Sequence, residues 1–228
     1  MDATERKVVR ASSIARSWCA SRSAALGDPM AANSTRDLVT RLAPTDPEGA
    51  ARLARTIDEP WFRSQALAWA ARFAADDRVE PLAEEALIAS YAESDPYRTV
   101  GSGAWAIRAL VERGRPVPAR RVLADLLVLA PEAEPTASRA EALFLVWQAA
   151  FALGRDARRK ILDMLLTTCQ GSDSWRVGRV FQDIAWMLGA SDHEMVQRIL
   201  AAMPEGRWKR QAKRRLAAAE SLKPRPFF

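Results

Sequence analysis

Aromatic residues with a cation one or two positions later recur along this chain of 228 residues. The pairs are Trp61 with Arg63, Tyr97 with Arg98, Trp175 with Arg176, and Trp208 with Lys209. A guanidinium beside an aromatic face can grip a carboxylate or stack on a nucleobase, so such a row could bind an acidic peptide or a nucleic acid. The structural alternative is an aromatic side chain that fixes the entry angle of a helix. Together with basic positions in the second helices described below, the cations expected to contact a partner are Arg63, Arg98, Arg121, Arg159, Arg176 and Arg179.

Positive charge is concentrated at the C-terminal end of the sequence. The chain has 34 basic and 28 acidic residues, but eight of the basic and only two of the acidic ones lie between Glu205 and Phe228. A repeat protein that binds nucleic acid should carry positive charge along its whole groove, and the balanced body of this chain does not. The final basic helix is either a solvated end cap or an anion-binding surface. The residues assigned to that surface are Arg207, Lys209, Arg210, Lys213 and Arg214.

Most catalytic chemistry lacks the residues that it needs. His193 is the only histidine, which removes the commonest general base and metal ligand, and Ser191 or Asp192 beside it reads as a helix cap. No phosphate-binding glycine loop occurs. Cys19 and Cys169 are far apart and are expected to be reduced thiols in a cytosolic protein. The sequence therefore predicts a protein without catalytic residues, metal or cofactor.

Four tryptophans reveal a repeat that must position these side chains. Each follows a small residue and precedes a short apolar run, and their spacings are 36, 42 and 39 residues: Trp69, Trp105, Trp147 and Trp186. A second helix with an apolar-Leu step follows each first helix, and alanine and leucine dominate throughout. We expect the four tryptophans to pack in the core between layers. The predicted helix-turn-helix units are 34–57, 60–92, 96–130, 135–169 and 173–203, followed by a basic helix at 206–220.

Proline and glycine punctuate these units. Pro47, Pro60, Pro96 and Pro135 each follow an acidic residue at an expected helix start, whereas Gly114 and Gly154 follow long helices. Ser34 or Thr35 is expected to cap the first helix, and "GSG" at 101–103 to permit close helix packing. The fold class is therefore all-α: a right-handed α-solenoid of about five units at 34–220, with a period of about 36–42 residues and a C-terminal capping helix. A leader at 1–33, partly ordered or helical, and a tail at 221–228 flank it.

In period, two-helix units and small residues at packing positions, residues 34–220 resemble the tetratricopeptide and HEAT classes of helical repeats. That resemblance implies a non-enzymatic scaffold or adaptor whose concave surface binds another protein, most simply an acidic peptide or protein surface. The chain is also similar in length, basicity and architecture to HEAT-type DNA glycosylases, which would give Trp175, Asp183 and Trp186 a role at a lesion. Nucleic-acid binding or repair is thus the alternative function, and a structural subunit of a larger assembly is the third.

The expected location is the cytoplasm. No segment approaches the roughly 20 apolar residues that span a bilayer. The N-terminal stretch is rich in Arg, Ser and Ala but lacks the apolar core of a signal peptide, and Met30 is an alternative start. The sequence predicts no membrane partner.

Overall fold

The computed structural model describes residues 29–218 and 222–224, and these residues are all-α, as the sequence predicts. We group the helices into two layers by the contacts given below. Layer A contains α2 (Pro29–Leu42), α4 (Pro60–Phe73), α6 (Pro96–Glu112), α8 (Thr136–Ala150), α10 (Trp175–Leu188) and α12 (Arg207–Ala217). Layer B contains α3 (Pro47–Arg55), α5 (Val79–Tyr91), α7 (Pro116–Leu129), α9 (Arg155–Cys169) and α11 (His193–Ala202). Short 3-10 turns follow α7, α8 and α10 at Ala130–Glu132, Phe151–Leu153 and Gly189–Ser191.

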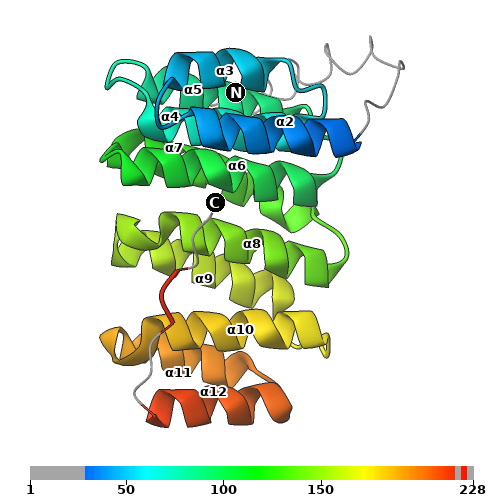
Figure 1. Cartoon of the computed structure of the whole chain (residues 1–228). Coiled ribbons are helices and arrows are strands. Elements are labelled where there is room, and N and C mark those ends of the chain that lie inside the picture. Colours follow the sequence, from blue (N-terminus) through cyan, green and yellow to red (C-terminus); the bar gives the residue numbers. More distant parts are fainter. Residues whose placement is uncertain (1–28, 219–221, 225–228) are drawn as a thin grey trace, which may run out of the picture.

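The helices stack along one axis, with α2 near one end and α12 at the other (Figure 1). In layer A each helix packs directly on the next, from α2 through α12. Each layer B helix packs against a helix of layer A, whereas contacts between successive layer B helices are sparse and involve mainly α7, α9 and α11. Among the described helices, none combines the length and the apolar character that crossing a bilayer requires.

The apolar core extends along the stack. One cluster joins α2 to α6 and is built largely of alanine, so the helix backbones can approach closely; a second cluster, richer in larger side chains, extends to α12. Leu87 and Trp105 pack against both clusters and connect them. Cys169 is a buried free thiol in the second cluster, and burial raises its pKa, whereas Cys19 lies outside the described residues.

Local signals place most helix ends where the sequence predicts them. Pro47 and Pro96 begin α3 and α6, and the preceding Asp46 and Asp95 accept hydrogen bonds from the backbone amides of Gly49 and Tyr97. These carboxylates satisfy amide groups that have no intrahelical partner. Gly114 and Gly154 follow α6 and the turn after α8 with φ of 66° and 100°, where a side chain would be strained. Pro135 directly precedes α8 rather than beginning it.

The expected cap at Ser34 or Thr35 is wrong. Helix α2 begins at Pro29, so both residues lie inside the helix. Their hydroxyls donate to the carbonyls of Met30 and Ala31, each at 2.9 Å. Inside a helix, a serine or threonine hydroxyl can donate a hydrogen bond to the backbone carbonyl four residues earlier. The presence of such a residue therefore does not by itself mark a helix start.

The tryptophans differ from one another more than the repeat suggests. Of the four repeat tryptophans, only Trp147 is fully buried, at 0% exposure, whereas Trp69, Trp105 and Trp186 are half-buried in layer A. Trp69 donates its indole N–H to the carbonyl of Thr40 in α2, which shows that it packs between neighbouring layer A helices. At the edge of the core, Trp69 keeps a polar partner and an apolar contact at once.

The small residues at 101–103 serve packing, as expected. A Cβ atom added at Gly103 would lie 2.8 Å from the buried side chain of Leu126, and one added at Gly101 would lie 3.1 Å from the ring of Trp61. Ser102 is also fully buried and donates to the carbonyl of Arg98.

Candidate functional site

Arg98, the cation of the pair that Tyr97 begins, is held by residues of its own chain. It pairs with Glu59, and its Nε lies 2.9 Å from a carboxylate oxygen of Glu93. The guanidinium also lies 5.6 Å from the centre of the Trp61 ring, and Trp61 stacks on Tyr97 with ring centres 6.2 Å apart. Burial raises the pKa of the Glu93 carboxyl group above its usual value, and the charge of Arg98 offsets part of this rise. These contacts connect α6 to the start of α4.

The six arginines expected to contact a partner do not form one row. Arg63, Arg98, Arg176 and Arg179 lie in layer A, whereas Arg121 and Arg159 lie in α7 and α9 of layer B. Arg63 donates to the carbonyl of Ile57 at 3.1 Å, and Arg159 donates to Glu194 at 2.6 Å. Arg121 is exposed and makes no ion pair with any described residue.

Acidic residues in neighbouring units explain why most of these arginines are occupied. The ion pairs Arg98–Glu59 and Arg179–Glu141 join residues 39 and 38 positions apart, close to the sequence period. A similar spacing of 37 positions joins Arg155 to Asp192, and this hydrogen bond lowers the pKa of the carboxyl group. Where solvent reaches both partners, as in the Arg179–Glu141 pair, such a contact adds little stability individually, about 0–1 kcal/mol, although it links neighbouring units. The sequence analysis did not predict these carboxylates, although each lies about one repeat away from its arginine, a spacing that can be found in the sequence.

The start of α10 presents the most open aromatic-cation group of layer A. Trp175 is 55% exposed. The guanidinium groups of Arg176 and Arg179 lie 5.7 and 5.4 Å from the centre of its ring. Both arginines share one carboxylate, with Glu141 lying 4.0 Å from Arg176 and 2.9 Å from Arg179. Two guanidinium groups with one carboxylate leave net positive charge beside an exposed aromatic face.

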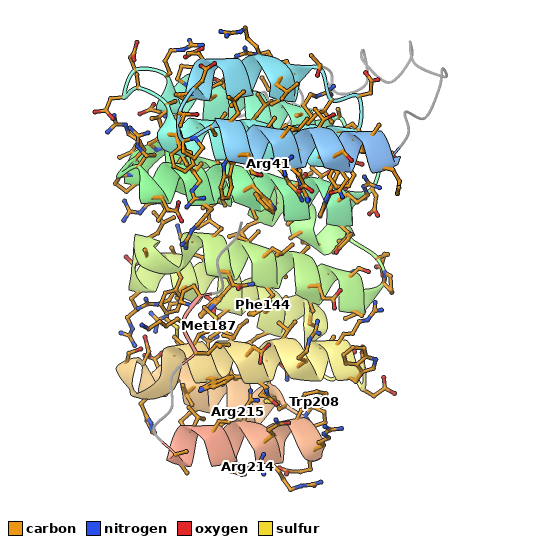
Figure 2. The ribbon with its side chains drawn as sticks, in the orientation of Figure 1. Arg41, Phe144, Met187, Trp208, Arg214 and Arg215 are labelled. Carbon is orange, nitrogen blue, oxygen red and sulfur yellow. The ribbon has the colours of Figure 1, made fainter. Side chains whose placement is uncertain are left out.

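Most of the cations assigned to the final helix are exposed. Arg207, Arg210, Lys213 and Arg214 make no ion pair with any described residue, whereas Lys209 lies 2.7 Å from Glu205 and is mostly buried. Figure 2 shows Arg214 on the outer side of α12 and Trp208 between α12 and α10. Trp208 packs so closely on α10 that a Cβ atom at Gly178 would lie 2.7 Å from its ring. One side of α12 is therefore docked and the other is cationic.

The residues considered for a lesion site share one side of α10 but are not equally accessible. At 100° per residue, Trp175, Asp183 and Trp186 fall within a quarter of the helix circumference. Asp183 is only 5% exposed and lies 3.9 Å from Arg215 of α12, whose guanidinium stacks 3.9 Å above the Trp186 ring. Arg215 was not singled out in the sequence, where it is one of three adjacent basic residues. In this arrangement Arg215 covers both Asp183 and Trp186.

Comparisons with protein-family models, with curated proteins and with solved structures find no match for this chain.

Proposed function

We propose that the chain is a non-enzymatic, cytoplasmic protein-binding module, a right-handed α-solenoid of about five helix pairs with α12 as its cap. Layer A helices pack on one another more closely than layer B helices do. A stack with one closely packed and one sparsely packed layer curves toward the closely packed side, so layer A would line the concave face. Cysteine usage supports the location, because the sequence has two cysteines and Cys169, the one that the structure describes, is a buried free thiol.

The observation that carries this proposal is the group at the start of α10. Trp175 offers an exposed aromatic face, and among the described residues Glu141 is the one carboxylate that forms ion pairs with Arg176 and Arg179. A carboxylate from a partner would provide the second guanidinium with a charge-assisted hydrogen bond, while an apolar side chain covers the indole. Aromatic and arginine anchors are the residues that most often dominate protein interfaces. The partner is therefore an acidic segment of another protein.

The proposal is tested by capture from extracts of the cells that make this protein, with and without nuclease. We expect a stoichiometric protein partner that survives nuclease and is lost with the double variant Arg176→Glu, Arg179→Glu. The matched control is Arg210→Glu, Lys213→Glu, which changes the net charge equally on α12. Equal capture by both double variants, or capture of no protein at all, would refute an acidic-partner site at α10.

A second candidate is nucleic-acid binding through α12, and the exposed cations of this helix favour it. Arg207, Arg210 and Arg214 are spaced to share a helix face, and none of them forms an ion pair with a described carboxylate. Four phosphate contacts would give a salt slope of about −3 to −4 in log affinity for duplex DNA. Fluorescence anisotropy with a labelled 20-base-pair duplex, at about 50 and 200 mM salt, tests this. Absence of binding at the lower salt would eliminate it.

A further inference from the structure

The C-terminal part of the chain covers the second half of α10. Arg215 stacks on the Trp186 ring and lies 3.9 Å from the Asp183 carboxylate. After α12, Leu222 packs against the core and its backbone N–H donates to the carbonyl of Trp186 at 3.4 Å. In Figure 1 the segment 222–224, drawn in red, runs from the level of α10 toward α8, away from α12. We call the surface formed by Gln182, Asp183 and Trp186 the α10 seat.

The α10 seat has the parts of a site for an extended cationic peptide. The indole of Trp186 is a platform for a guanidinium, and the buried carboxylate of Asp183 adds opposite charge. The carbonyl of Trp186 belongs to the last turn of α10, so it has no partner within the helix and can accept from a peptide backbone. A polyanion would not suit this seat, because Asp183 would repel it.

Two buried polar atoms of the α10 seat lack a hydrogen-bond partner among the described residues. Gln182 is only 2% exposed, yet its Oε1 has no hydrogen-bond partner among the described residues, and the buried Nε1 of Trp186 has none either. The two side chains lie one turn apart on α10. A buried polar group without a partner is costly, so a ligand that satisfied both groups would bind better than the segment that now covers them. The backbone of an extended peptide carries the donor and the acceptor required.

We propose that the α10 seat binds an extended cationic peptide, and that Arg215 with segment 222–224 occupies it as a displaceable ligand within the same chain. Release would not require α12 to leave. Trp208 and the buried Ala212 hold this helix against α10 and the core, ahead of Arg215. Trp175 lies about three turns before Trp186 on α10, and its two arginines suit an acidic ligand whereas Asp183 suits a cationic one, so this inference does not rest on the proposed acidic partner.

The test uses the full chain and a fluorescein-labelled peptide, KRRLAAAESLKP, which repeats residues 213–224. Anisotropy titration should give weak binding to the wild-type chain, whose seat is occupied. Arg215→Ala weakens the segment of the chain that occupies the seat. We expect the labelled peptide to bind this variant about tenfold more tightly than the wild type, because the competing segment loses one cation–π contact and one ion pair. Leu222→Asp should act in the same direction. The matched control Arg210→Ala lies on the exposed side of α12 and should bind like the wild type.

A second change identifies the seat. Asp183→Asn in the Arg215→Ala background should reverse the gain in affinity, as should a peptide with alanine in place of its second arginine. Arg121→Glu, on the exposed side of α7 in layer B, should leave peptide binding unchanged. The proposal is overturned if neither opened variant binds the peptide, or if Asp183→Asn has no effect. It is equally overturned if both Arg215→Ala and Leu222→Asp fail to fold by circular dichroism, because the contact would then be structural rather than displaceable.

Discussion

Arg98 holds α6 against the start of α4, and replacing it with methionine tests that role. The substitution retains an apolar stem but removes the guanidinium from between Glu59 and Glu93. The side chain of Glu93 is only 8% exposed, whereas that of Arg98 is 38% exposed. The variant therefore leaves a largely buried carboxylate without its cation and removes a contact with the Trp61 ring.

The expected loss follows from the burial of the two partners. Removing one partner of a fully buried ion pair costs about 3–5 kcal/mol. Because solvent reaches Arg98, we expect a smaller loss in the free energy of unfolding, about 2 kcal/mol, with the cation–π contact included. For a chain of this size that loss corresponds to a fall in Tm of roughly 4–8 °C. Urea denaturation followed by circular dichroism at pH 7.5 measures it.

The sign of the pH dependence follows from Glu93. Burial raises its pKa in the folded state, so protonation favours the folded state as the pH falls toward that value. Arg98 lowers the pKa of Glu93, and its removal raises that pKa further. The deficit of Arg98→Met should therefore be smaller at pH 5 than at pH 7.5, and Glu93→Gln in the same background should recover about half of it. A loss below about 0.5 kcal/mol, or no recovery with Glu93→Gln, would refute the structural role of Arg98.

Three further predictions concern single positions. Trp147→Ala should lower the free energy of unfolding by about 3–5 kcal/mol, because this side chain is fully buried; a loss under 1 kcal/mol in urea denaturation would contradict its place in the core. Gly154→Ala should cost about 1–3 kcal/mol in the same assay through backbone strain alone, because φ is 100° and ψ is −178°, a conformation used almost only by glycine, and no atom crowds the position; an unchanged stability would show that the strain is absent. Arg155 lowers the pKa of Asp192 in the folded state, so the stabilising effect of this carboxylate is present above its unfolded pKa and is lost as the pH falls through its folded pKa. Arg155→Ala should therefore flatten the fall in Tm between about pH 4 and pH 2. An unchanged dependence of Tm on pH would argue against the Arg155–Asp192 pair.

The group around Trp175 and the α10 seat show which parts of a binding site residue types along the sequence can predict. The sequence singled out Trp175, Arg176 and Arg179 because an aromatic residue and its cations are neighbours along one helix. It gave no reason to connect Asp183 and Trp186 with Arg215, which lies 29 residues beyond Trp186. That contact arises because Trp208 docks on Gly178 and sets the position of α12 on α10.

The sequence by itself determined the helices and many of their ends. Asp95 and Pro96 start α6 because a cap and a fixed φ act within a few residues, and Gly154 ends the turn after α8 for the same local reason. Only the tertiary structure decided what the cations do. Whether Arg98 faces a partner or Glu59, and whether Leu222 is free or bonded to Trp186, depends on how separate helices pack. The register between packed helices is a property of the whole core, and no short stretch of sequence contains it.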